Sequence, residues 1–153
     1  MIKLATLIYV QDKANNKTLM LFRNKKPNDV HEGKWNGLWW KLEQGESPES
    51  CCRRELLEES WLIAKNIELK WILTAPNFSH DSDRYIFVYN VTSRKWKIKE
   101  CNEWELHWIE SDKILELNLR EWDKKFIPLL DKPWIFHTTM RYKNGKLEKY
   151  VIE

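Results

Sequence analysis

The segment from Ser47 to Ser60 constrains the fold most, because it is the clearest helix in the chain. Ser47 is a good N-cap residue, Pro48 suits the first helical position, and Glu49 suits the positive end of the helix dipole. No Gly or Pro interrupts the residues that follow, up to Ser60. We therefore expect one helix to begin at Pro48.

Most of the remaining chain consists of short strand-like runs. Polar turns such as Gln11–Lys17 separate them. The expected strands are Ile2–Val10, Thr18–Arg23, Leu38–Glu43, Ile67–Thr74, Arg84–Thr92 and Glu103–Ile109. A hairpin is expected near the end of the chain, because Asn144-Gly145 separates the strand-like runs Ile135–Tyr142 and Leu147–Ile152.

A second helix is expected at Glu121–Leu130, where Phe126, Leu129 and Leu130 are spaced to share one apolar face. The sequence contains no repeat, low-complexity tract or linker, so residues 1–153 are expected to form a single domain. Many strands with two helices predict an α+β fold, in which the helices pack on the faces of a mixed β-sheet.

Composition excludes several classes of protein. The net charge of +3 comes from 26 basic and 23 acidic residues, and the short Lys-rich stretches indicate a solvated face rather than a binding site for nucleic acid polymers. No apolar run approaches the roughly 20 residues that span a bilayer. Cys51, Cys52 and Cys101 do not form a disulfide framework, which favours reduced thiols in a cytoplasmic protein.

Three carboxylates lie on one face of the first expected helix, because Glu55, Glu58 and Glu59 are spaced i, i+3, i+4. One interpretation is a solvated acidic face partnered by Arg53 and Arg54. The other is a site for a divalent cation, since Mg²⁺ prefers hard oxygen ligands together with water and substrate phosphate oxygens. Such a site would assist the attack of water on phosphorus.

The residues around this helix resemble the Nudix box, G-x5-E-x7-R-E-U-x-E-E-x-G-U, where U is aliphatic. The box would begin at Trp40, and both of its glycine positions carry tryptophan, Trp40 and Trp61. The other positions match, with Glu46, Arg54, Glu55, Leu56, Glu58, Glu59 and Leu62 at the required spacing. The chain is therefore identified as similar to the Nudix hydrolases, whose fold is an α/β/α sandwich.

The resemblance implies a role for each matching residue. Arg54 would orient the carboxylates, and Glu46 would support the loop and the metal site. Glu55, Glu58 and Glu59 would hold the metal ions or serve as general base. Further metal ligands would be Glu46, the Trp40 backbone carbonyl and a later glutamate, Glu103 or Glu105. The expected ion is Mg²⁺, for which Mn²⁺ can substitute.

The resemblance extends to the MutT-like branch, which hydrolyses oxidised purine nucleoside triphosphates. Asn36 would hydrogen-bond the base, although Trp35-Asn36-Gly37 could equally be a tight turn with a packed tryptophan. Asp123 fits a second base contact, and Lys41 is a further candidate for substrate binding. Arg120 stands where an aromatic residue is expected, which weakens the case for oxidised guanine.

Two alternatives stay open. The same metal chemistry could act on ADP-ribose, a dinucleoside polyphosphate or capped RNA, which the box does not separate. The chain could also be an inactive Nudix domain that binds a ligand or partner, since Trp40 stands where the chain approaches metal and phosphate. The expected partner is a small nucleotide substrate, with no nucleic acid polymer and no membrane, and the protein is expected to be a monomer or homodimer.

Tryptophan is unusually frequent and glycine unusually rare, with ten Trp and four Gly where roughly 7% Gly is average. Eight of the tryptophans stand where the family or local turn chemistry favours glycine: Trp39, Trp40, Trp61, Trp71, Trp96, Trp104, Trp122 and Trp134. We hypothesise that UGA codons read as glycine in the source organism were translated as tryptophan. Other codons at these positions, or tryptophan masses in peptides of the natural protein, would contradict this hypothesis.

Overall fold

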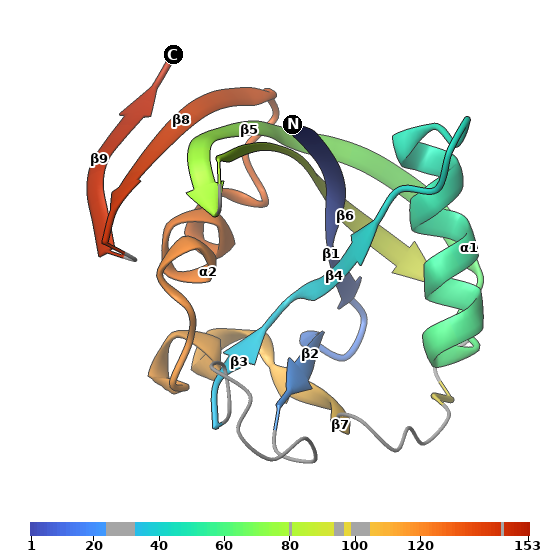
Figure 1. Cartoon of the computed structure of the whole chain (residues 1–153). Helices are drawn as coiled ribbons and strands as arrows, with labels where there is room; N and C mark the ends of the chain where they lie inside the picture. Colours follow the sequence, from blue (N-terminus) through green and yellow to red (C-terminus); the bar gives the residue numbers. More distant parts are fainter. Residues whose placement is uncertain (24–32, 80, 94–96, 99–104, 145) are drawn as a thin grey trace.

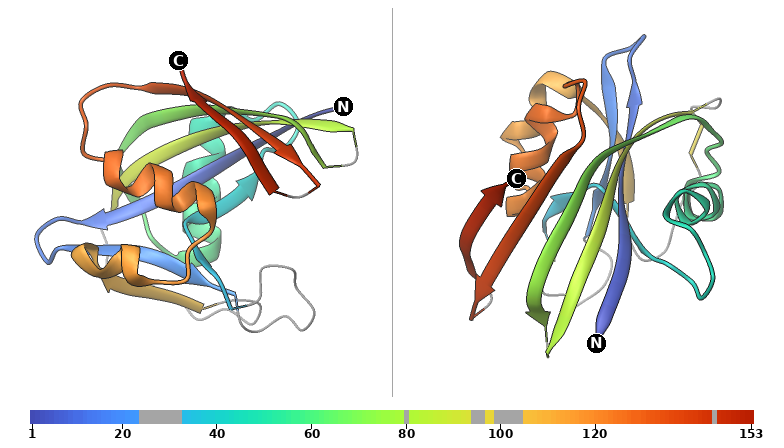
Figure 2. Two further views of the ribbon diagram at one scale, coloured as in Figure 1. Left: turned by 90° about the vertical axis from the view of Figure 1, so that its left-hand side faces the viewer. Right: turned by 90° about the horizontal axis from the view of Figure 1, so that it is seen from above.

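The computed structural model describes residues 1–23, 33–79, 81–93, 97–98, 105–144 and 146–153. One mixed β-sheet lies between helix α1 (Pro48–Ser60) and helix α2 (Glu121–Phe126), as the right-hand view of Figure 2 shows. This arrangement confirms the α+β class and the mixed sheet that the sequence predicts.

The order of strands along the sheet is β3-β2-β1-β6-β5-β8-β9, with β4 pairing with β1 and β7 with β2 (Figure 1). The pairs β1–β6 and β5–β8 are parallel, and the other pairs are antiparallel. The strands are β1 (Ile2–Asp12), β2 (Lys17–Phe22), β3 (Trp35–Asn36), β4 (Leu38–Lys41), β5 (Ala64–Ser79), β6 (Ser82–Ser93), β7 (Glu105–Glu110), β8 (Phe136–Lys143) and β9 (Lys146–Ile152).

Strand β1 is buried on both faces, which explains its continuous apolar sequence. Ile8 and Val10 belong to the hydrophobic cluster that includes Leu56 of α1. Leu7 and Tyr9 point to the other face and belong to the cluster that includes Phe126 of α2. The strand therefore supplies core residues to both layers of helices.

Helix α1 has the bounds and the N-cap that the sequence predicts. The Ser47 side chain accepts a hydrogen bond from the Ser50 backbone N–H at 3.1 Å, and Pro48 is the first helical residue. The helix ends at Ser60. The C-cap residue Trp61 has the left-handed conformation with φ 64° and donates its N–H to the Leu57 carbonyl at 3.0 Å.

The later part of the chain differs from the prediction in two places, helix α2 and the turn η1. Helix α2 ends at Phe126 instead of Leu130, and the 3-10 turn η2 (Ile127–Leu129) follows, because Pro128 has no backbone N–H to donate. The predicted strand at Glu103–Ile109 is present as β7 from Glu105 on, and its first two predicted residues lie outside the described residues. The 3-10 turn η1 (Ser111–Glu116) was not predicted.

The predicted terminal hairpin is present as β8 and β9, and Asn144 has φ 52°, as this kind of turn requires. The tight turn considered for Trp35-Asn36-Gly37 is wrong. Trp35 and Asn36 form β3 and pair with β2. No helix in the described part of the chain is long and apolar enough to cross a membrane.

The structure places the suspected tryptophans in different environments. Of those it describes, Trp61 alone has positive φ, and it is also exposed. Trp71 is fully buried between Phe126 and Phe136, and its Nε1 donates to Thr138 Oγ1 at 3.0 Å. Trp122 is buried as well. The backbone argument for glycine is thus confined to Trp61, while Trp96 and Trp104 lie outside the described residues.

Candidate active site

Arg54 joins acids of the loop before α1 and of α1 itself around one guanidinium. Its Nε and Nη2 donate to the two carboxylate oxygens of Glu46 at 2.6 and 2.9 Å. Its Nη1 donates to Glu55 Oε1 at 2.5 Å and to Glu58 Oε2 at 3.3 Å. Glu43, which the sequence did not single out, lies 3.7 Å from the same Nη1. The predicted orienting role of Arg54 therefore has a geometric basis.

These contacts change the proton affinities of the acids. Hydrogen bonds from Arg54 lower the pKa of Glu46 to about 2. Burial raises the pKa of Glu55, and the like charges of Glu58 and Glu59 add to this effect while Arg54 opposes it. Hydrogen bonds to Glu46 raise the pKa of Arg54 above its ordinary value. The negative charge that remains around Glu55 is a favourable environment for a cation.

The structure brings together some of the predicted metal ligands. Glu55 and Glu58 meet at Arg54, whereas the ion pairs of Arg54 with described residues do not include Glu59. Among described residues, no three His, Cys, Asp or Glu side chains are close enough to enclose a metal ion. The donors themselves fit a divalent cation, since carboxylate oxygens are the ligands that Mg²⁺ prefers.

A groove of about 460 Å³ runs beside the loop that enters α1. Lys41 and Glu46 line it, together with Glu43, Gln44 and Gly45 of the loop and residues from the start of β1. The exposed Lys41 side chain thus stands next to the acids, as a phosphate contact requires. The backbone carbonyl of Trp40 accepts a hydrogen bond from Thr6 Oγ1 at 3.5 Å.

A second polar cluster is buried on the α2 side of the sheet. Asp123 is fully buried, and its Oδ1 accepts hydrogen bonds from the Tyr9 hydroxyl and, at 3.0 Å, from the Gly37 N–H. Asn36 is also buried, and its Nδ2 donates to the Gly37 carbonyl at 2.6 Å. Asn36 Oδ1 and Asp123 Oδ2 have no hydrogen-bond partner among the described residues. Such groups are costly to bury unless a ligand or solvent meets them.

Burial also dominates the ionisation of this cluster. It raises the pKa of Asp123 to about 6, although hydrogen bonds from Tyr9 and Gly37 act in the opposite direction. Burial and the neighbouring Asp123 carboxylate raise the pKa of Tyr9. Arg120, whose pKa burial lowers to about 10, lies with its guanidinium carbon 3.9 Å from the centre of the Trp122 ring.

Aromatic rings pack next to this cluster. Trp39 stacks on Trp122 with 5.1 Å between ring centroids, and Phe78 lies 5.8 Å from the same ring. The guanidinium of Arg84 lies over Phe78 at 4.7 Å. No local sequence pattern indicates Tyr9, Phe78 or Arg84 for this site, because each contacts α2 or β4 across a long stretch of chain.

The structure describes only one of the two candidates for a later metal-binding glutamate. Glu103 lies outside the described residues. Glu105 lies on β7, where its Oε2 is 3.3 Å from the His107 Nε2. The role of either residue at the metal site therefore stays a prediction.

The fold and the acid cluster on α1 define a class of enzyme. Residues 1–130 match the NUDIX domain family model, and the chain belongs to this family of hydrolases. Nudix hydrolases act on small nucleotide substrates and generally use divalent metal ions.

Individual relatives place the chain more closely, among MutT-like enzymes. An oxidized purine nucleoside triphosphate hydrolase from Danio rerio is 27% identical over 112 residues, which cover 73% of this chain and 69% of the relative. The crystal structure of a MutT protein from Bacillus halodurans superimposes with a TM-score of 0.82 at 27% identity, covering 99% of this chain and 97% of the other. MutT from Methanosarcina mazei shares the fold, with a TM-score of 0.66 at 20% identity over 86% and 94% of the two chains.

Proposed function

We propose that this Nudix hydrolase converts an oxidised purine deoxynucleoside triphosphate to the monophosphate and pyrophosphate in a Mg²⁺-dependent reaction. The observation that carries the proposal is the buried pair Asn36 and Asp123, each with one acceptor atom that has no hydrogen-bond partner among the described residues. The relationship to an oxidized purine nucleoside triphosphate hydrolase supports the same substrate class.

The chemistry of the pair suits a purine edge. An amide such as Asn36 offers a donor and an acceptor in one plane, as does the edge of a purine. Asp123, with a pKa of about 6, can present either a protonated or an ionised carboxyl near neutral pH. Oxidation at position 8 of a purine changes the pattern of donors and acceptors, so a site with this adaptability can select for it.

The acid cluster on α1 supplies the hydrolytic side of the proposal. A divalent ion would be held by Glu55, Glu58 and Glu59, with the Trp40 carbonyl and Glu46 alongside, and would neutralise charge as water attacks phosphorus. Arg54 holds Glu46 and Glu55 in position through the contacts described above. Lys41 would bind phosphate oxygens in the adjoining groove.

Pyrophosphate release with Mg²⁺, measured over a panel of nucleotides, tests the proposal. We expect kcat/KM for 8-oxo-dGTP to exceed that for dGTP, ADP-ribose, a dinucleoside polyphosphate and capped RNA. Glu58→Gln should abolish turnover on all of them, and chelation of Mg²⁺ should do the same. The panel should be run on the chain as written and on a version with glycine at the eight suspected tryptophans.

Each competing function has its own result in this panel. Equal turnover of 8-oxo-dGTP and dGTP, or preference for ADP-ribose, would overturn the sanitising function but keep the hydrolase. Nucleotide binding without turnover in both versions would identify a binding domain. We also propose a cytoplasmic location, in keeping with the buried thiols of Cys51 and Cys52, neither of which forms a disulfide.

A further inference from the structure

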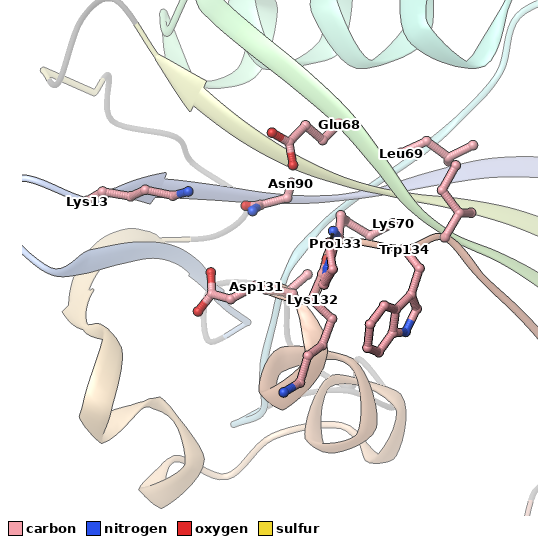
Figure 3. A pocket seen from close by; sticks show the side chains of 11 residues that line it. Lys13, Glu68, Leu69, Lys70, Asn90, Asp131, Lys132, Pro133 and Trp134 are labelled. Carbon is pink, nitrogen blue, oxygen red and sulfur yellow. Dashed lines mark hydrogen bonds between the residues drawn. The ribbon is translucent and has the colours of Figure 1, made fainter.

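A pocket of about 660 Å³ lies away from both clusters described above. The turn after β1, the first half of β5, the end of β6 and the segment between α2 and β8 form its walls (Figure 3). None of the Nudix box residues lines it. We name it the lysine pocket, after Lys13, Lys70 and Lys132, which line it together with Asn90, Glu68 and Asp131.

Lys70 is the unusual residue of this pocket, because its side chain is buried and only 5% of the residue is exposed. Its Nζ donates a hydrogen bond to the backbone carbonyl of Lys132. None of the ion pairs among described residues includes Lys70. An ammonium group in this position is costly unless an anion or several acceptors satisfy its charge and its remaining N–H groups.

Asn90 adds an independent observation. Its Nδ2 lies 3.4 Å from Gln11 Oε1, whereas its Oδ1 is buried without a partner among the described residues. Figure 3 shows the Lys13 side chain extending toward Asn90 and the Lys132 ammonium turning away from it. The pocket thus presents two ammonium groups, from Lys13 and Lys70, next to an acceptor that lacks a donor.

We propose that the lysine pocket binds a small phosphate ester that carries hydroxyl groups. Lys13 and Lys70 would meet the phosphate, because ammonium groups on flexible stems bind phosphate as point charges. Asn90 Oδ1 would accept a hydrogen bond from a ligand hydroxyl, and Glu68 or Asp131 at the rim would accept another. The two rim carboxylates would disfavour a larger polyanion, which selects for a small ligand of modest charge.

Titration of ribose 5-phosphate into the full chain by calorimetry tests the proposal. EDTA is included so that metal-dependent binding at α1 does not contribute. Saturable binding is expected, and Lys70→Met should weaken it at least about tenfold, the loss that a charge-assisted hydrogen bond implies. The matched control Lys65→Met, which removes an exposed lysine of the same strand, should leave the affinity unchanged.

A second variant distinguishes weaker binding from misfolding, because substitution of the buried Lys70 can also disturb the fold. Lys13 is exposed, so Lys13→Gln removes its charge without disturbing the core and should also weaken binding. Inorganic phosphate, which lacks carbon-bound hydroxyls, should bind more weakly than ribose 5-phosphate. Absence of binding to the wild-type chain, or equal affinities of wild type, Lys70→Met and Lys13→Gln, would overturn the proposal.

The proposal for the lysine pocket and the proposed hydrolase function can be tested independently of each other. Glu58→Gln should retain ribose 5-phosphate binding while losing turnover. Lys70→Met should lose ribose 5-phosphate binding while keeping its turnover of nucleotides in the absence of that ligand.

Discussion

Among single residues, Arg54 links the acids of the candidate active site. Its planar group donates to both oxygens of Glu46 and also reaches Glu55 and Glu58. One lysine ammonium cannot reproduce this geometry, because it is a point charge without a fixed fork of donors. The first prediction concerns this difference.

We expect Arg54→Lys to lower kcat/KM by about 10- to 100-fold, the usual effect of losing a residue that orients metal ligands. The matched control is Arg53→Lys, since Arg53 pairs with Glu49 on the exposed side of the same helix. Steady-state pyrophosphate release measures both variants. Losses of equal size in the two variants would contradict the prediction, because the effect would then not depend on the contacts of Arg54 with Glu46 and Glu55.

Asp123 provides a prediction about pH. Its pKa rises from 3.8 to about 6 on folding, so between these values the unfolded chain releases its proton first and stability falls as pH rises. Wild type should lose up to about 3 kcal/mol from this residue between pH 4 and pH 7. Asp123→Asn, which keeps the shape and an acceptor for Tyr9, should not show this loss.

Urea unfolding of wild type and Asp123→Asn at a series of pH values measures the effect. Glu46 acts in the opposite direction, because its pKa is lowered to about 2 and its stabilisation is lost as pH falls. That contribution is common to both proteins and cancels in their difference. The same pH profile in both proteins would contradict the raised pKa of Asp123.

At the scale of elements, the residue that follows α1 has a backbone conformation that is unfavourable for its residue type. Trp61 has φ 64°, a conformation that costs a residue with a Cβ roughly 1–2 kcal/mol. Trp61→Gly should therefore be more stable than Trp61→Ala by about 1 kcal/mol, since both remove the exposed ring and only glycine removes the strain. Thermal or urea unfolding of the two variants checks this, and an alanine variant of equal stability would contradict it.

The elements also show which features the sequence could predict. Helix α1 was predicted with its bounds because its signals are local: a capping serine, a proline at the first position and an unbroken run of helix formers. Helix α2 came out shorter because the apolar spacing of Phe126, Leu129 and Leu130 suggested a continuous helix despite Pro128. The two-residue strand β3 is too short to have a periodic pattern of its own.

In the candidate site, likewise, the sequence predicts contacts between residues that are close in sequence and not contacts between distant ones. Four residues of the site lie close together in sequence, so their spacing predicts that they are in contact: Arg54, Glu46, Glu55 and Glu58. The contact between Tyr9 and Asp123 joins residues that are 114 positions apart, and no local pattern indicates it. Lys70 looked like an ordinary charged residue of a strand until the fold showed that it is buried.

At the scale of the whole molecule, two hydrophobic clusters lie on opposite faces of one sheet and share strand β1. Because both clusters contain residues of β1, disruption of this strand would disrupt both clusters. We therefore expect residues 1–153 to unfold as a single cooperative unit. Far-UV circular dichroism and tryptophan fluorescence should give the same midpoint in urea. Separate midpoints for the two signals would indicate two domains.

Strand β1 also carries one contact for each of the two sites. Thr6, which faces α1, hydrogen-bonds the Trp40 carbonyl at the start of the Nudix box, while Tyr9, on the opposite face, holds Asp123. Adjacent residues of a strand alternate between faces, so inserting a single residue before Thr6 would exchange these partners everywhere downstream. The same stretch of backbone therefore fixes the position of the proposed base-binding cluster relative to the proposed hydrolytic cluster.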